Sequence, residues 1–183
     1  FARDLLVQAK SAKRRDLVAS SKAFLDKVRA AADKKVSLAL EKLGVAWPAG
    51  PAGAMSGPAP QLQMMLSPAA GSGEAKLSAG SVAKIRGVVK NVGAVPAYRV
   101  RAVLQSDNTL FDENEMVFGK LGPGESKSYD LTVKVPASTF TRTDELKATL
   151  STQRGPLKDT GADLLVNIEG KPRPLFAYTY QTI

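Results

Sequence analysis

The sequence predicts a mostly β protein: an immunoglobulin-like antiparallel β-sandwich preceded by an α-helical segment and a Pro/Gly/Ala-rich linker. Apolar residues recur at three- and four-residue steps in residues 1–47, which is the period of an amphipathic helix. Residues 48–60 contain no charged residue. From residue 61 onward apolar and polar residues alternate over short runs, which indicates half-buried strands. The predicted domains are therefore a helical segment at 1–47, a linker at 48–60 and a sandwich at 61–183.

The helical segment is expected to be the end of an upstream domain or a helical hairpin. Asp16 is a start signal for its longer helix, and Gly44 followed by Pro48 predicts the end of that helix. Its apolar stripe consists of Leu17, Phe24, Leu25, Val28, Ala32, Val36, Leu40 and Leu43. Burial of such side chains contributes roughly 1.5–3 kcal/mol each. We therefore expect the stripe to pack against the sandwich, against an upstream domain or against a second copy of the helix.

The linker has the sequence "PAGPAGAMSGPAP" and is almost entirely Pro, Ala and Gly. A segment of this composition has few large side chains to bury and is expected to build no packed element. It is predicted to behave as a semi-flexible tether. This makes it the clearest domain boundary in the sequence.

Three stretches of the predicted sandwich alternate most clearly. Their expected inward-facing residues are Ala83, Ile85 and Val89, then Tyr98, Val100, Ala102 and Leu104, then Tyr129, Leu131, Val133 and Val135. Further strands are expected in "QLQMMLS", "ELKATLSTQ", "DLLVNIEG" and "PLFAYTYQ", whereas "GSGEAKLSAGS" is expected to be a loop. In "VFGKLGPGESKSYDLTVKVP" a strand end precedes Pro123 and Gly124, which predict a hairpin corner. Seven or eight short antiparallel strands without a helical pattern among them are typical of an immunoglobulin-like sandwich.

The composition limits the chemistry that the chain can perform. The 183 residues include neither histidine nor cysteine, which excludes disulfides, thiolate nucleophiles and cysteine zinc sites. No cofactor and no metal are predicted. The formal net charge is +9, and residues 1–47 supply most of it, with 11 Lys or Arg against 5 Asp or Glu. No run reaches the roughly 18 apolar residues that a membrane span requires. Because the sequence begins with Phe1, it is expected to be a piece of a longer protein.

Two charged stretches are candidate binding sites. The basic stretch at 10–35 could bind nucleic acid or an anionic membrane. Its acidic residues are interspersed and its aromatic residue, Phe24, lies on the apolar stripe, which favours a solvated helix face. The acidic stretch at 106–115 offers oxygen ligands for calcium, but its spacing departs from that of a calcium loop and favours a solvated loop. The carboxylates concerned are Asp107, Asp112, Glu113 and Glu115.

Two Ser–Lys pairings and one group of aromatic residues are further candidates. The pairings at 20–22 and 126–128 could supply a nucleophile and a base, but activation requires a buried Lys beside an oxyanion hole, and both patterns are typical of exposed positions. The aromatic residues are Phe176, Tyr178 and Tyr180, which share one face of the last expected strand. They could form a platform for a sugar or peptide, although packing in the core is favoured. The sequence thus predicts no catalytic, cofactor-binding or metal site, and leaves the binding residues open.

Two turn motifs carry a family resemblance. The chain has "V-x-N-x-G" at a strand end and "L-x-P-G-E" before the next alternating strand, with Val89, Asn91 and Gly93, then Leu121, Pro123, Gly124 and Glu125. Together with their neighbouring strands, these motifs resemble the bacterial immunoglobulin-like modules of CARDB type, which are related to cell-adhesion domains. The resemblance covers about two-thirds of the chain. It implies an immunoglobulin-like fold.

A narrower resemblance includes the helical segment. "FARDLLVQAK", a basic helix, a Pro-rich linker and this module together are similar to the region after the catalytic core in bacterial carboxyl-terminal processing (tail-specific) serine proteases. That family relies on a Ser–Lys pair in its core, and no segment here matches the core. The resemblance therefore implies a non-catalytic fragment of a periplasmic, cell-surface or secreted bacterial protein.

The predicted function is that of a non-catalytic accessory module with a structural or recognition role. One alternative is a regulatory domain that binds substrate peptides or partners by strand addition to a sheet edge. The other is an adaptor that binds anions or nucleic acid through the basic helix. Expected partners are proteins, namely a parent catalytic core, a second copy or a substrate peptide. Nucleic acid and a membrane span are not expected.

Overall fold

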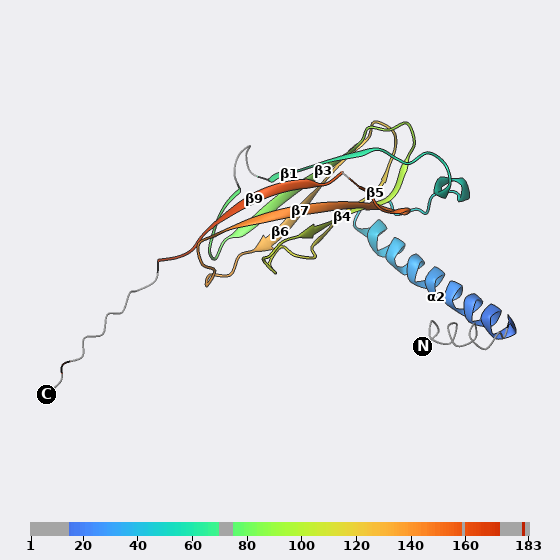
Figure 1. The fold of residues 1–183 in the computed structure, drawn as a ribbon, viewed down its shortest axis with the longest axis horizontal. Helices are drawn as coiled ribbons and strands as arrows, with labels where there is room; N and C mark the ends of the chain where they lie inside the picture. Colours follow the sequence, from blue (N-terminus) through green and yellow to red (C-terminus); the bar gives the residue numbers. More distant parts are fainter. Residues whose placement is uncertain (1–14, 70–74, 159, 173–180, 182–183) are drawn as a thin grey trace. The chain divides into compact units, whose positions relative to one another are not determined.

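A computed structural model describes residues 15–69, 75–158, 160–172 and 181 of the chain. The chain forms two compact units, Phe1–Pro48 and Ala49–Ile183. The second unit is a β-sandwich whose described strand pairs are antiparallel except for one, so the predicted fold class is confirmed. Figure 1 shows the strands of this unit and the helix of the first. The finer domain limits at 47 and 60 stay a prediction.

The first unit contains the helix α2 (Arg15–Lys42). It ends in a Schellman motif around Gly44, which has a φ of 77° and donates its N–H to the Glu41 carbonyl. In the same motif the Val45 N–H donates to the Leu40 carbonyl. The predicted helix end is therefore confirmed, since glycine adopts this left-handed conformation at little cost. Much of the apolar stripe is exposed, namely Phe24 by 55%, Val28 by 49%, Val36 by 49% and Leu43 by 77%.

The sandwich consists of two sheets with immunoglobulin-like topology. The three-stranded sheet has the order β1 (Leu62–Pro68), β3 (Val82–Asn91), β6 (Ser126–Lys134). The six-stranded sheet has the order β2 (Ala75–Ser78), β9 (Ala162–Glu169), β7 (Arg142–Thr152), β4 (Ala97–Gln105), β5 (Glu115–Leu121), with β8 (Gly155–Pro156) paired to β7. Strands β1, β3 and β6 correspond to A, B and E of the immunoglobulin fold, and β4, β7 and β9 to C, F and G.

The core lies between the two sheets and follows the predicted alternation. Its buried residues on β3 and around β6 include Ala83, Ile85, Val89, Leu131, Val133 and Val135. At the centre of β3, a Cβ on Gly87 would lie 2.5 Å from the Met116 sulfur and 3.2 Å from the Met64 methyl carbon. The missing side chain leaves room for these two flexible methionines to fill the space between the sheets.

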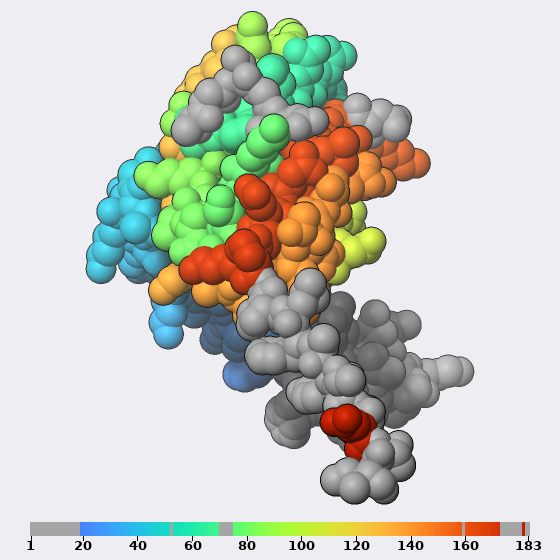
Figure 2. Space-filling view, turned by 90° about the vertical axis from the view of Figure 1, so that its left-hand side faces the viewer, coloured from blue at the N-terminus to red at the C-terminus, as the bar shows by residue number. Residues whose placement is uncertain are grey.

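The predicted loop between the first two strands contains β2. This prediction was wrong, because residues 75–78 pair in parallel with β9. The sequence gives little warning, since a four-residue run is too short for alternation to be recognised. Between β1 and β2 the chain passes from one sheet to the other. In the space-filling view, β9 (red) lies beside the green surface to which β2 belongs (Figure 2).

The turn at Pro123 and Gly124 joins two different sheets. Strand β5 belongs to the six-stranded sheet and β6 to the three-stranded sheet. The prediction of a hairpin corner is therefore wrong, although the turn is present and Gly124 has the positive φ of 74° that favours glycine. Turn chemistry determines the local path of the chain, whereas sheet membership depends on partners far away in sequence.

Strand β4 begins with a bulge. Its register with β5 shifts between Ala97 and Val100, and the intervening Arg99 has a φ of 54°. As a result Ala97 and Val100 are both buried, while Tyr98, predicted to face inward, is only half-buried. From Val100 onward the predicted alternation is confirmed. The predicted strand at 174–181 lies, apart from its last residue, outside the described residues.

Candidate functional site

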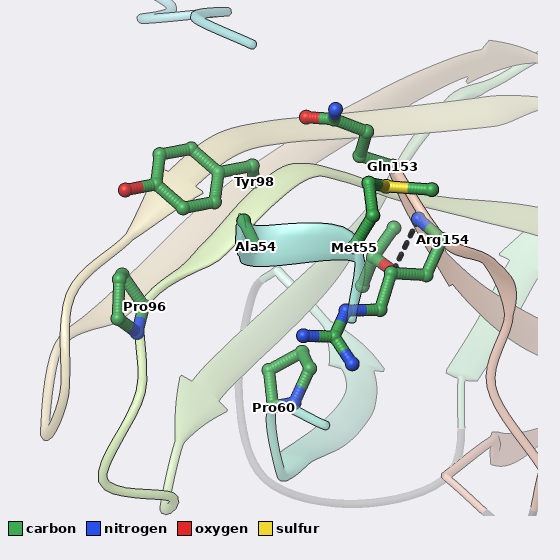
Figure 3. A pocket seen from close by; sticks show the side chains of 8 residues that line it. Ala54, Met55, Pro60, Pro96, Tyr98, Gln153 and Arg154 are labelled. Atoms are coloured by element: carbon green, nitrogen blue, oxygen red, sulfur yellow. Dashed lines mark hydrogen bonds between the residues drawn. The ribbon is translucent and has the colours of Figure 1, made fainter. Parts of the chain in front are cut away.

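Residues 49–60, the docked segment, contact one end of the sandwich instead of forming a free tether. They include the short 3-10 helix η1 (Ala52–Met55). The Gly50 N–H donates to Gln153 Oε1 at 2.6 Å. The guanidinium of Arg154 donates to two successive carbonyls, those of Gly57 and Pro58, each at 2.8 Å. Figure 3 shows Gln153 and Arg154 on opposite sides of the path of η1.

The docked segment is complementary to Tyr98. A Cβ on Gly50 would lie 2.8 Å from the Tyr98 ring, so the ring occupies space that only glycine leaves open. The Lys120 ammonium lies 5.6 Å from the centre of the same ring, in a cation–π contact. The ring is positioned by the bulge in β4, and the Tyr98 carbonyl accepts the Gln153 N–H at 2.9 Å. The segment is thus held by its backbone, and at Gly50 by the close approach that the absence of a Cβ permits.

A small pocket remains between the docked segment and the sandwich. It is lined by η1, by Tyr98 and Pro96, by Pro60 and by the turn after β7 (Figure 3). The pocket has too little space for a ligand larger than water. Its residues therefore hold the chain's own segment and leave no room for a substrate.

Asn91 joins the two turn motifs that carry the family resemblance. The residue is completely buried. Its Nδ2 donates to the carbonyls of Val95 and Leu121, at 2.9 and 3.2 Å, and its Oδ1 accepts the Gly93 N–H at 3.1 Å. Its backbone N–H and carbonyl bond to Glu125 and Gly124, so every polar group of the residue is satisfied. In this chain the two motifs therefore form one hydrogen-bonded corner.

The Glu125 carboxylate stabilises the same corner. It accepts the Gly122 N–H at 2.6 Å. This hydrogen bond lowers the pKa of Glu125 below its ordinary value, and the Lys127 ammonium at 3.5 Å lowers it further. Lys127 also donates to the Lys120 carbonyl at 2.6 Å, which connects the start of β6 to the end of β5.

The carboxylates at 106–115 form local hydrogen bonds. Asp112 accepts the Ser106 N–H at 3.1 Å, whereas Glu115 accepts from the Arg101 guanidinium at 2.9 Å. Asp107 and Glu113 are exposed. No cluster of three or more acidic side chains suited to a metal ion occurs in the part of the chain that the structure describes. The structure supports the reading of this stretch as a loop that stabilises itself.

The Ser–Lys pairings lack the geometry of a nucleophile and a base. Ser126 and Ser128 are exposed, while Lys127 points to the other side of β6 and is engaged by Lys120 and Glu125. In the other pairing Lys22 is exposed on α2. The aromatic residues at 176, 178 and 180 lie outside the described residues, so their role stays a prediction.

The basic helix is still only a candidate for anion binding. Acidic residues are interspersed along α2, and apolar residues of the same helix, including Phe24, Val28 and Val36, are exposed beside its charges. Within the described ranges, no helix is long and apolar enough to cross a membrane.

The edges and faces of the sandwich are the remaining surfaces for a partner. Strand β1 carries no charged residue, unlike the edge strands β2, β5 and β6, and its Met65 is 70% exposed. A groove opens where β1 ends and β3 continues, lined by Pro68 and Val82 and by charged residues that include Lys76, Lys84, Arg86 and Asp130. Edge strands of this kind can pair with another chain.

Sequence reasoning missed Gln153 and Arg154. Both lie in "QRGPLKDTG", which the sequence identifies only as a turn. A Pro- and Gly-rich segment has backbone carbonyls without a donor of its own, and an Arg side chain elsewhere in the chain can supply one. Nothing local indicates which of the many cations supplies it, because the contact spans 97 positions in sequence.

The comparisons with known proteins concern the fold alone. No protein-family model and no curated protein matches the sequence. Among solved structures, the CARDB domain of a Pyrococcus furiosus protein, solved in complex with di-metal ions, has a TM-score of 0.47 at 18% identity over 60% of this chain and 88% of that one. Red sea bream transglutaminase has a TM-score of 0.46 at 18% identity, over 60% of this chain and 15% of that one. Escherichia coli alpha-2-macroglobulin has 0.42 at 16% identity, over 64% and 17%.

Proposed function

We propose that this chain is a non-catalytic accessory module in which the sandwich is a rigid support for the helical segment. The observation that carries the proposal is the anchoring of the docked segment by Gln153 and Arg154. A free linker of Pro, Ala and Gly would let two units move independently. A linker bonded to one of them moves with it.

The anchoring leaves a short hinge. The last hydrogen-bonded residue after α2 is Val45, whose N–H binds the Leu40 carbonyl, and the first anchored residue of the docked segment is Gly50. Only residues 46–49 lie between these two points. The hinge is therefore much shorter than the predicted linker at 48–60, and it includes Pro48, whose ring restricts φ.

The proposed parent is a secreted or periplasmic bacterial peptidase of the carboxyl-terminal processing type. Support comes from the order of elements, in which a basic helix, a Pro-rich segment and a CARDB-like module follow one another. In such a parent the module would hold the helical segment at a defined distance from the catalytic core. Recognition of a partner would then be a property of the sandwich surface and not of a catalytic group.

The width of a distance distribution tests the support role. Because the chain has no cysteine, a spin label can be placed on exposed residues of each unit, for instance at Lys35→Cys and Lys147→Cys. We expect a narrower distance distribution in the parent chain than in a variant that combines Gln153→Ala with Arg154→Ala. Arg101→Ala, which removes another surface guanidinium of the sandwich, is the matched control and should leave the width unchanged. Equal widths in all three proteins would contradict the proposal.

Strand addition at β1 is the second candidate function. It is favoured by the lack of charge on this edge, since β2, β5 and β6 each carry at least one charged residue. An extended peptide added there would extend the three-stranded sheet. When the isotope-labelled chain is titrated with an extended peptide, the amide chemical shifts of β1 should change first. Shifts that begin on β5 or β6, or no shifts at millimolar peptide, would exclude it.

A further inference from the structure

The outer face of the three-stranded sheet carries an unbalanced positive charge. Strand alternation places four cations on it, against a single carboxylate. The cations are Lys84, Arg86, Lys90 and Lys134, and the carboxylate is Asp130. Asp130 is already engaged by Arg86, with two hydrogen bonds of 2.7 and 2.8 Å. This leaves three lysines on one flat surface, which we call the basic face.

The outer face of the six-stranded sheet differs. Its exposed cations are matched in number by carboxylates, and several are paired, as in Arg101–Glu115 at 2.9 Å and Lys147–Glu145 at 3.2 Å. Ordinary solubility requires charge of both signs, as on this second face. Three of the cations on the basic face lie on β3, the central strand, where they do not protect a sheet edge. Neither role explains the charge of the basic face.

An apolar row crosses the basic face between its lysines. Met65 of β1 is paired in register with Val88 of β3, and Val88 with Ser128 of β6. Met65 is 70% exposed and Val88 is half-buried. On one side of Val88 along β3 lies Lys90, which is in register with Gln63. On the other side lie Arg86 and then Lys84. The face therefore presents a cation, an apolar patch and a second cation along one direction.

This arrangement fits a protein partner better than a nucleic acid. Exposed methionine is enriched in protein interfaces, whereas single-stranded nucleic acid is bound by stacking on aromatic side chains. The outward positions of the three strands hold no aromatic residue, since Tyr129 faces the core side of β6. Lys84 and Lys90 are six residues apart on one strand, or roughly 20 Å at about 3.3 Å per residue. An extended segment of about seven residues covers that distance.

We propose that the basic face binds an acidic, extended protein segment whose two carboxylates face Lys84 and Lys90 and whose apolar side chain contacts Met65 and Val88. Because the Met65–Val88 pair lies between Lys90 and Lys84 on the face, the apolar side chain of the segment must lie between its two carboxylates. Small hydroxyl residues on β6, including Ser128 and Thr132, leave the face flat enough for such a segment to lie on it. This binding surface involves none of the residues that hold the docked segment, so it stands or falls independently of the proposed support role.

Titration of the isotope-labelled full chain with a defined peptide tests the proposal. The probe is the heptapeptide Glu-Ser-Leu-Ser-Thr-Ser-Glu, blocked at both ends, and the readout is the set of amide chemical shifts. We expect the shifts to concentrate on β1, β3 and β6. Replacing both Glu residues of the probe by Gln should weaken binding by at least about tenfold, as should the double variant Lys84→Glu with Lys90→Glu.

Two further variants separate the named contacts from net charge. Lys147→Glu removes a lysine from the outer face of the six-stranded sheet and should leave Kd within about twofold, whereas Lys90→Glu alone should raise it by several-fold. Met65→Ser should weaken binding of the probe that contains Leu. It should not weaken binding of a probe in which this Leu is replaced by Ser. Thermal unfolding confirms that each variant is folded. If Lys90→Glu is not folded, Lys90→Gln replaces it.

Four outcomes would overturn the proposal. They are shifts centred on α2 or on the six-stranded sheet, equal losses from Lys90→Glu and Lys147→Glu, no binding at millimolar peptide, and tighter binding of duplex DNA to the same face.

Discussion

Two segments rich in proline and glycine are held in opposite ways. The corner at 122–125 is stabilised by Asn91 at the end of β3 and by the Glu125 carboxylate of the turn itself. The docked segment at 49–60 is stabilised by Gln153 and Arg154, about a hundred positions away. The first is held by a buried side chain next to the core, and the second by half-buried side chains at the surface.

The turn residues of the corner could be predicted from the sequence, whereas the path of the docked segment could not. In the corner, glycine and proline determine the turn, so its existence could be predicted from the turn residues themselves. In the docked segment the same residue types adopt a defined path only because distant side chains bond to its carbonyls. Composition thus predicts the turns that a segment can form alone, but not the path that distant partners impose on it.

Removal of the Asn91 side chain should have the largest effect. Asn91→Ala removes the side-chain donor to the carbonyls of Val95 and Leu121, and each unsatisfied buried group costs about 1–3 kcal/mol. We expect a loss of about 2–4 kcal/mol in the free energy of unfolding, since some groups will find water. Urea denaturation measures it. Thr143→Ala, which removes one exposed side-chain bond to Asn167, is the control and should cost clearly less.

Gly50→Ala should have the next largest effect, and only on the docked segment. The new Cβ would lie 2.8 Å from the Tyr98 ring, so the ring or the segment would have to shift. We expect destabilisation of about 1–2 kcal/mol for the docked state, with little change in the unfolding of the core. Amide exchange of Ala54, whose N–H binds the Pro51 carbonyl, reports the docked state. Gly53→Ala is the matched control, because nothing lies within 4 Å of a Cβ at that position.

If the Tyr98 ring is the obstacle, a smaller side chain there should rescue the variant. Gly50→Ala in a Tyr98→Leu background should cost less than in the parent chain. An equal cost in both backgrounds would locate the strain elsewhere in the segment.

Loss of the Arg154 guanidinium should have a smaller effect of the same kind. Its two bonds to carbonyls are exposed, and such bonds contribute about 1 kcal/mol together. Arg154→Ala should therefore speed exchange of the Gly57 amide by several-fold while the global unfolding midpoint stays nearly constant. Arg154→Lys should behave like Arg154→Ala, because an ammonium does not match the fork that spans two successive carbonyls. Wild-type exchange in the lysine variant would show that charge alone holds the segment.

Much of the fold could be predicted because alternation is a local signal. Ile85, Val89, Leu131 and Val133 lie where the period of two places them. Strand β2 and the sheet membership of β6 could not be predicted, since they depend on pairing with β9 and β3, which are distant in sequence. Of the candidate surfaces, alternation alone places the cations of β3 on the side opposite Ala83, Ile85 and Val89. Their accumulation on one face becomes visible only once β1 and β6 are known to flank β3.

The pH dependence of the corner should be the smallest effect. The pKa of Glu125 is lowered in the folded chain by the Gly122 N–H and by Lys127. A lowered folded pKa means that the ionised carboxylate stabilises the fold above the pKa of the unfolded chain, and that this contribution is lost as the pH falls through the folded value. Because the side chain is 44% exposed, solvent screening should hold the contribution below about 1 kcal/mol. Urea midpoints of the parent chain and Glu125→Gln should therefore differ at pH 7 and draw closer at an acidic pH, as the pH falls through the folded pKa. A constant difference at both pH values would assign the effect to the shape of the side chain instead of its charge.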